Sequence, residues 1–432
     1  MHLAAPAEFR NSTICETPEP NLQQRLGIAV VDTIMRHPML QVGMMDATSK
    51  TPSWIQLQSL DLTHHIKWPD LGEHEDFEQT VQETFRAQLD DRFQDVTIKQ
   101  PGWKITIFRQ GNAPIMEVLL TWNHPQFDGA GPLQGIWEET RPQFFNRDKS
   151  WAAWCPIRTS PYKTHYRAFF MDNVSLVAIL ALCRQNKTTI TGLLNGLALI
   201  AFSLRLDSTV APAFQSSTVM DHRRNLPPAP PDAPWVRSDR AVGNYVTQCL
   251  HRYETELVAR IRSKLPADAS EGRDLSADLQ RELWAVSAQN RQEIVGKLET
   301  GLRNDLVGLF KYVTNWQQTM SKMAKRTRQF TWLVTNIGVL DGNTSTRLGT
   351  TTTRSPTGGD SKSDDGQRWS IDRAQFGLSA EIPAAAIEFA PVSVAGQGMC
   401  ISANWPDCAV DETFGENIMA DLERWLAQLA SL

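Results

Sequence analysis

The chain has 432 residues, of which 41% are hydrophobic and 21% are charged. This composition is typical of a globular protein and excludes an extended, disordered chain. The length exceeds what one hydrophobic core usually holds, so we predict two lobes, at residues 1–164 and 165–432.

The formal net charge of −5 makes nucleic acid and anionic membranes poor candidates for the main partner. No apolar run reaches the length that spans a bilayer, and residues 1–8 lack the basic and apolar regions of a secretory signal. The six cysteines form no CxxC pair, which favours reduced thiols over disulfides or a zinc site. We therefore expect a cytoplasmic protein.

The first part of the chain alternates between helical and strand patterns. Helical spacing of apolar residues predicts helices, and two-residue alternation predicts strands. The expected helices lie between Asn21 and His37 and at 77–89; the expected strands are 40–45, 53–58, 103–109 and 116–122. Gly111-Asn112 predicts a hairpin turn between the last two strands, and residues 64–76 predict a polar turn region.

The second part repeats this alternation, which predicts an α+β fold with mostly antiparallel strands in each half. The polar segment 341–367 predicts a surface loop. The expected helices are 174–185, 190–204, 254–264, 276–298, 302–327 and 413–429; the expected strands are 166–171, 214–220, 242–250, 330–335, 369–376, 385–394 and 399–404.

The stretch 116–131 places a histidine at the end of a predicted buried strand. Pro125 ends that strand just after His124, and Asp128 and Gly129 begin a turn and a helix. A histidine with its ordinary pKa of about 6.5 can accept a proton near neutral pH. If His124 deprotonates an alcohol or amine, that group can attack a thioester carbonyl directly. The alternative is an ordinary strand-end histidine and a helix-capping aspartate.

Residues 124–129 (His-Pro-Gln-Phe-Asp-Gly) resemble the HxxxDG signature of the CoA-dependent acyltransferase superfamily. This superfamily includes plant-type BAHD acyltransferases, fungal alcohol and trichothecene-type acetyltransferases, and peptide-synthetase condensation domains. Other segments resemble family motifs in the expected order: 37–40, 190–206, 219–228, 243–246 and 335–338. The resemblance spans nearly the whole chain, and it is greatest to fungal secondary-metabolite O-acyltransferases.

The resemblance implies a monomer of two chloramphenicol-acetyltransferase-like lobes with a tunnel between them. It also implies that His124 is the general base and that Gly129 allows close approach of substrate or backbone. Asp128 is then mainly structural and pairs with Arg223 of the second lobe, because a partly buried carboxylate needs such a partner. Acyl-CoA would be a co-substrate, with no bound cofactor and no metal.

Two departures narrow the resemblance. Asn123 stands where condensation domains usually have a second histidine, which argues against peptide-bond formation. The plant-type DFGWG motif is absent, and its nearest counterpart, 373–379, keeps only Phe376 and Gly377.

Acyl transfer also needs a hydrogen-bond donor for the oxyanion of its transition state. The candidates are the backbone near Gly129, the Asn336 amide and the Ser379 hydroxyl. Trp122 and Asn244 are candidate tunnel residues. Each of these side chains could instead hold a turn or fill a core.

Three histidines, at 64, 65 and 74, lie near carboxylates, but their spacing matches no known metal-ligand pattern. We interpret this region as a solvated acidic loop. No nucleotide-binding loop or nucleophile elbow is present in the sequence.

The predicted function is transfer of an acyl group, expected to be acetyl, from a CoA thioester to a hydroxyl of a natural product. One alternative is a donor carried by an acyl carrier protein, as in chain release, with 341–367 as a docking surface. Another is a condensation-fold protein recruited to a non-acyl cyclisation. The last is a binding protein without turnover.

Overall fold

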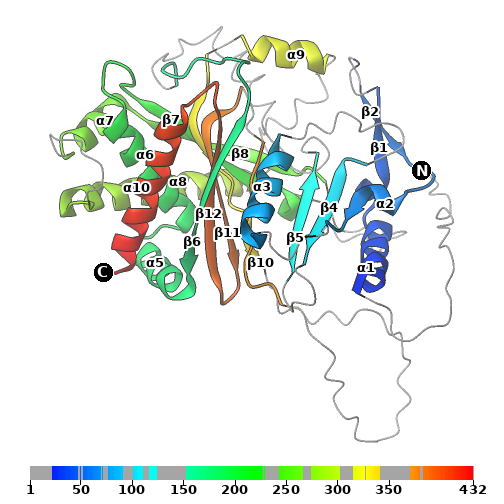
Figure 1. Cartoon of the computed structure of the whole chain (residues 1–432). Helices are drawn as coiled ribbons and strands as arrows, with labels where there is room; N and C mark the ends of the chain where they lie inside the picture. Colours follow the sequence, from blue (N-terminus) through cyan, green and yellow to red (C-terminus); the bar gives the residue numbers. More distant parts are fainter. Residues whose placement is uncertain are drawn as a thin grey trace, which may run out of the picture.

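The computed structural model of the chain describes residues 22–46, 49, 52–69, 71, 76–90, 101–109, 116–123, 152–226, 228, 243–265, 274–301, 315–325, 327–340, 370–379 and 383–431. Within these ranges helices and strands alternate along the chain, and two separate groups of strands with their helices lie side by side (Figure 1).

The smaller group is built from the first third of the chain. Its elements are α1 (Leu22–Arg36), the 3-10 helix η1 (Pro38–Gln41), β1 (Val42–Met45), β2 (Ser53–Gln56), α2 (Leu62–His65), β3 (Ile66–Lys67), α3 (Phe77–Leu89), β4 (Trp103–Phe108) and β5 (Glu117–Trp122). β1 and β2 form an antiparallel pair, and the described strands β3, β4 and β5 form a sheet in that order.

The antiparallel pairing of β4 with β5 confirms the predicted hairpin, with Trp103 opposite Trp122. The turn at 110–115 lies outside the described residues. The strand 116–122 was predicted to be buried, and this is wrong. Val118 and Leu120, which lie two residues apart and so share one face of β5, are 50% and 52% exposed.

The larger group contains a mixed sheet of seven described strands. Its elements are β6 (Thr164–Asp172), α5 (Asn173–Gln185), α6 (Ile190–Arg205), β7 (Phe214–Asp221), η3 (Arg223–Asn225), β8 (Val246–Tyr253), α7 (Thr255–Arg262), α8 (Ala277–Thr300), α9 (Trp316–Met323), β9 (Phe330–Val334), β10 (Gly338–Leu340), β11 (Ala385–Val394), β12 (Gly398–Pro406) and α10 (Glu412–Ala430). The strand order is β6-β12-β11-β9-β7-β8, with β10 beside β11.

The sequence predicted mostly antiparallel strands, and this is wrong for the larger sheet. β9 is parallel to both β7 and β11, and β10 is parallel to β11. The reason is that long crossovers separate these strands in the chain, and a crossover can return in either direction. β7 with β8 and β11 with β12 are neighbours in the chain and are antiparallel.

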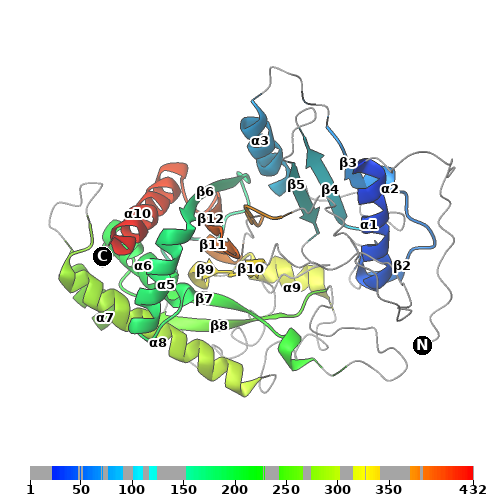
Figure 2. The same cartoon turned by 90° about the horizontal axis from the view of Figure 1, so that it is seen from below.

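One face of this sheet is covered by α5, α6, α8 and α10 (Figure 2). α6 is apolar on all sides, and a helix of this kind is expected to be buried; Leu193, Leu197 and Phe202 have no exposed surface. The indole of Trp332 stacks between the rings of Phe202 and Tyr253, each with centroids 5.3 Å away. The core of the larger group therefore lies between the sheet and α6.

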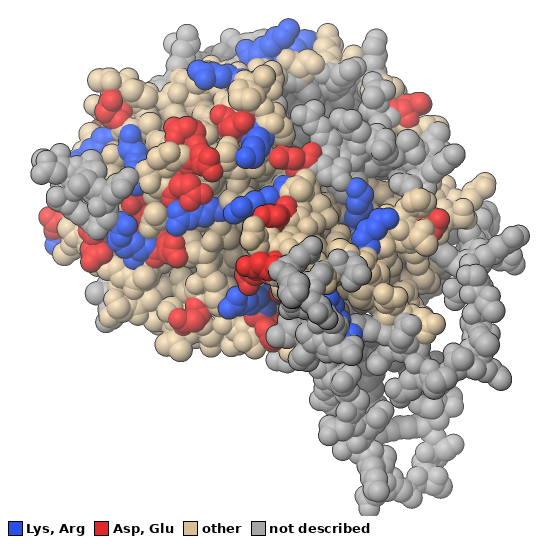
Figure 3. Space-filling model, viewed as in Figure 1, with Lys and Arg blue, Asp and Glu red and all other residues tan. Residues whose placement is uncertain are grey.

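Side-chain caps set several helix starts. The carboxylates of Asp76, Asp172 and Asp411 accept a backbone N–H in the first turns of α3, α5 and α10. Ion pairs then cover the outer face of α10, where Arg167 of β6 contacts Glu416 and Glu423. Charges of both signs are interspersed over this face (Figure 3).

The region 64–76 was predicted to be a solvated loop, and this is wrong for its first residues. His65 ends α2 and is 3% exposed, with its Nδ1 2.7 Å from the carbonyl oxygen of Trp103. Its ring also packs on the Trp103 indole, with centroids 4.5 Å apart. Burial lowers the pKa of His65, so it is a neutral core histidine. The sequence does not reveal this because the contact is 38 residues away.

Two further predictions about elements differ from the structure. Residues 370–379 form no regular strand, although 369–376 was predicted as one. Of the predicted helix 302–327, the structure describes α9, and 302–314 lies outside the described residues. Among the described residues, no single helix is long and apolar enough to cross a membrane.

Candidate active site

The three residues of the HxxxDG motif, His124, Asp128 and Gly129, lie outside the described residues. The structure describes the strand that leads to them. The β4–β5 ladder continues one residue past Trp122, where the Asn123 N–H donates to the carbonyl oxygen of Gly102 at 2.6 Å. The residue immediately before His124 is therefore held by main-chain hydrogen bonding.

α3 fixes the end of β5 from one side. The Thr121 hydroxyl donates to the side-chain oxygen of Gln88, and the Gln88 amide donates to Thr106 of β4 at 3.1 Å. Trp122, a candidate tunnel residue with a core role as the alternative, packs against the small core around Ile34 and Trp103 and is half-buried.

Residues 370–379, which we call the bridging segment, connect the smaller group to the large sheet. Phe376 stacks on Trp122, with ring centroids 5.9 Å apart. Its carbonyl oxygen accepts hydrogen bonds from Ser402 at 2.5 Å and from Tyr166 at 3.5 Å. Burial raises the pKa of Tyr166, so its hydroxyl stays protonated and donates.

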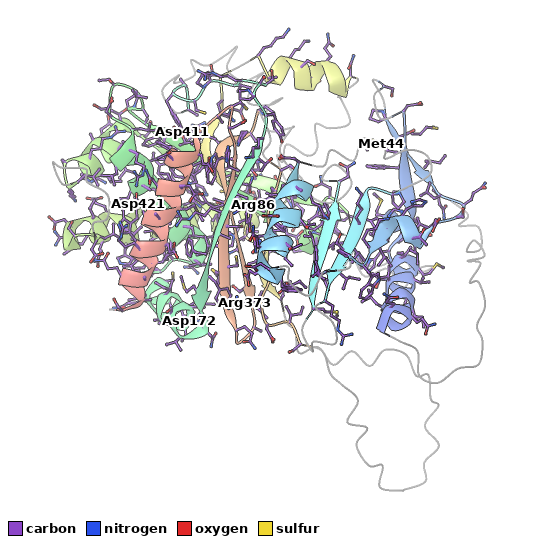
Figure 4. All side chains as sticks on the ribbon, in the orientation of Figure 1. Met44, Arg86, Asp172, Arg373, Asp411 and Asp421 are labelled. Carbon is purple, nitrogen blue, oxygen red and sulfur yellow. The ribbon has the colours of Figure 1, made fainter. Side chains whose placement is uncertain are left out.

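The structure explains why a glycine follows Phe376. A Cβ on Gly377 would lie 3.0 Å from the rings of Phe85 and Tyr166, tighter than side chains normally pack. Only glycine fits at this position without displacing one of these rings. The guanidinium of Arg373, in the same segment, lies over the Phe170 ring, 5.0 Å from its centroid (Figure 4).

Ser379 was a candidate oxyanion donor, but its hydroxyl donates to the carbonyl oxygen of Leu89 at the end of α3. Asn336 was another. Its amide nitrogen donates to the Thr191 hydroxyl at 2.9 Å, and its oxygen accepts the Gly338 N–H at 2.8 Å. Both side chains therefore have partners within the fold, and their role as oxyanion donors stays a prediction.

Arg223 and Asn244 lie together beyond the ends of β7 and β8. The Arg223 guanidinium donates to Asp221 at 3.0 Å and to the carbonyl oxygen of Gly243 at 2.8 Å, and it lies over the Tyr245 ring. Gly243 has a φ of 156°, and a Cβ there would lie 2.9 Å from the Tyr245 ring. Asn244 is exposed. The pair between Arg223 and Asp128 stays a prediction.

The sequence analysis missed a buried polar network centred on Asn195 in α6. The Asn195 amide nitrogen donates to the Thr191 carbonyl and to the Thr218 hydroxyl, both at 3.1 Å. Its oxygen accepts from Ser216 and from the Trp332 indole, both at 2.9 Å. A lone asparagine inside the apolar run of α6 was the available signal, because a buried amide must be satisfied.

The network continues through His251, which is fully buried, to the partly exposed Glu293. His251 Nε2 lies 2.9 Å from the Thr218 hydroxyl, and Nδ1 lies 2.5 Å from a carboxylate oxygen of Glu293 on α8. This carboxylate–histidine–threonine order resembles a catalytic triad. Thr218 is itself buried and accepts from Asn195, so the arrangement is structural. In the described part of the chain, no three His, Cys, Asp or Glu residues are grouped to hold a metal ion.

Comparison with known proteins supports the architecture. A probable alcohol acetyltransferase, FCK4 of Fusarium pseudograminearum, is 20% identical over an alignment that covers 93% of this chain and 86% of the relative. The structure matches the TRI3 trichothecene 15-O-acetyltransferase of Fusarium sporotrichioides with a TM-score of 0.63 and 14% identity, over 95% of this chain and 86% of that protein. This chain has the fold of that acetyltransferase.

A second solved structure, the SgcC5 protein of Streptomyces globisporus, matches with a TM-score of 0.53 and 12% identity, over 95% of this chain and 89% of that one. No protein-family model matches the sequence. The comparisons confirm the α+β fold and the resemblance drawn from the motifs.

Proposed function

We propose that this protein is an acyl-CoA-dependent O-acyltransferase that transfers an acyl group, expected to be acetyl, to a hydroxyl of a natural product. The observation that carries the proposal is the similarity to acetyltransferases over more than nine-tenths of the chain, combined with an HxxxDG sequence directly after β5. The proposal includes a monomer with lobes at 1–164 and 165–432, a tunnel between them and no bound cofactor.

The proposed chemistry requires one proton acceptor. His124 takes the proton of the acceptor hydroxyl, and the oxygen attacks the carbonyl carbon of the thioester. The tetrahedral intermediate then breaks its carbon–sulfur bond, which yields the ester, and the imidazolium returns its proton to the CoA thiolate. The strand ladder that extends to Asn123 supports this role, because a base must be held within hydrogen-bond reach of its substrate.

The test is incubation of the protein with acetyl-CoA and a fungal metabolite extract. Free CoA is measured by chromatography, and new acetyl esters are measured by mass spectrometry. His124→Ala should lower turnover by about 100- to 10,000-fold, the usual contribution of a general base. His64→Ala, at an exposed histidine in α2, is the matched control and should retain full activity.

Three results would contradict the proposal. The first is full activity of His124→Ala. The second is transfer that occurs only from acyl groups on a carrier protein and never from acyl-CoA. The third is conversion of an extract component without any thioester.

A further inference from the structure

We propose that the bridging segment is a releasable strap: residues 370–379 hold the smaller and larger groups together, and release of this segment opens the molecule between them. The two groups have separate hydrophobic cores, around Ile34 and Trp103 in the smaller group and under α6 in the larger one. Groups with separate cores move relative to each other unless their interface is large and apolar. The contacts that join them therefore set their spacing.

One side of the bridging segment lies along α3, the helix between β5 and the edge of the large sheet (Figure 1 and Figure 2). Three residues of the segment contact three residues of α3: Gln375 contacts Gln82, Gly377 lies against Phe85, and Ser379 donates to the carbonyl oxygen of Leu89. These positions are two apart in the segment and three or four apart in α3, which puts each set on one side of its element. Two residues of extended chain cover about 6–7 Å, and three or four helical residues cover about 5–6 Å, so the contact continues along this length.

The other side of the bridging segment lies on the large sheet. The Phe376 carbonyl accepts the hydroxyls of Ser402 and Tyr166. Two residues later, the Leu378 N–H donates to the side-chain oxygen of Asn404 at 3.4 Å. Ser402 and Asn404 are also two residues apart, so they share one face of β12, and neither has exposed surface. Buried polar side chains of the sheet therefore bind the main chain of the segment.

The polar character of this face makes the contact reversible. The Asn404 amide also donates to the carboxylate of Glu388 at 3.3 Å, and Glu388 is buried on β11. Buried polar groups need partners, and the bridging segment supplies some of them. When the segment leaves, water can bind these groups in its place. An apolar face of the same size would instead be unfavourable in water.

α3 also contacts the large sheet directly. The Phe85 ring packs on Tyr166 of β6, with centroids 4.9 Å apart, and the Asp90 carboxylate accepts the Thr164 N–H at 3.0 Å. Both contacts lie in or just after the second half of α3, whereas Gln82 lies in its first half. Release of the bridging segment leaves the two direct contacts as the pivot about which the groups separate.

Gly377→Val tests whether docking of the bridging segment holds the groups together. The valine would meet the rings of Phe85 and Tyr166, because even a Cβ at this position lies 3.0 Å from both. Amide exchange in a peptide covering 370–379, measured by mass spectrometry, should become about 10- to 100-fold faster, the factor for overpacking a close contact. The radius of gyration from small-angle X-ray scattering should increase. Exchange in α6 should stay slow, which separates release from unfolding.

Gly296→Val is the matched control, at an exposed glycine in α8 with no atom within 4 Å of its Cβ position. It should match the wild-type chain in both measurements. Faster exchange of the segment in Gly377→Val with an unchanged radius of gyration overturns the proposal, because the segment then only covers the surface. Unchanged exchange overturns it as well.

A charge series decides the case if Gly377→Val unfolds the protein. Gln82→Glu with Gln375→Glu places like charges where the two amides meet, and it should make exchange of the segment at least about 10-fold faster. Gln82→Glu with Gln375→Lys places opposite charges there, and its exchange should stay within about fivefold of the wild-type rate. Equal exchange rates in the two double variants overturn the proposal. None of these measurements requires turnover, so their outcome is independent of the acyltransferase proposal.

Discussion

The Asn195 network predicts a specific energetic coupling between α6 and β9. Asn195→Leu keeps approximately the same volume and removes both the donor and the acceptor of the amide. The buried Trp332 indole N–H then loses its acceptor, which is the side-chain oxygen of Asn195. Leaving this N–H unpaired costs about 1–3 kcal/mol, and the lost hydrogen bonds to Ser216 and Thr218 each add about 1 kcal/mol.

Asn195→Leu should therefore lower the free energy of unfolding by about 3–5 kcal/mol. Trp332→Phe removes the unpaired N–H, so in the Asn195→Leu background it should cost less than in the wild-type chain, by about 1–3 kcal/mol. The assay is urea unfolding of the two single variants, the double variant and the wild type, followed by circular dichroism.

Trp405→Phe provides the control for the loss of an indole. The Trp405 N–H is buried and has no hydrogen-bond partner in the described ranges, so its loss should be additive with Asn195→Leu. If Trp332→Phe is also additive with Asn195→Leu, within about 0.5 kcal/mol, the network does not hold these elements together in the way described.

Two further predictions concern charged groups. If Asp128 pairs with Arg223, Asp128→Ala should reduce both the yield of folded protein and the activity. Arg223→Ala should have the same effect. A stable, folded and inactive Asp128→Ala protein would instead indicate a direct catalytic role. Burial alone would raise the pKa of Glu282, but hydrogen bonds from Lys264 and Arg260 outweigh it and hold the pKa below its ordinary value of 4.5. A carboxylate of this kind stabilises the fold above the pKa it has in the unfolded chain, and the stabilisation is lost as the pH falls through the folded pKa. The stability difference between wild type and Glu282→Gln, measured by urea unfolding, should therefore shrink between pH 6 and pH 3; a constant difference would contradict the assigned pairing.

Local sequence signals located most helices and strands. α3 runs from Phe77 to Leu89 as predicted, because Asp76 caps it and its apolar residues share one face. β11 covers the predicted range 385–394, since its mostly apolar residues, among them Ile387, Phe389 and Val392, suit a buried central strand. Such signals depend on residues that are close together in the chain, so they can be recognised from the sequence alone.

Contacts between distant residues decided the parts that were missed. Residues 369–376 were predicted as a strand, but Phe376 and Gly377 contact Trp122, Phe85 and Tyr166, more than 200 residues earlier in the chain. These contacts give the segment a bridging role in place of a position in a sheet.

The sequence by itself determined the type and order of most elements, the resemblance to CoA-dependent acyltransferases and the position of His124 in the chain, two residues after β5. Only the tertiary structure decided which polar side chains near that strand are already paired. Asn336 and Ser379 already have hydrogen-bond partners in the fold, which their positions in the sequence did not reveal. The physical reason is that a hydrogen bond depends on the position of its partner in space, and these partners are separated by more than 100 residues in the chain for Asn336 and Ser379.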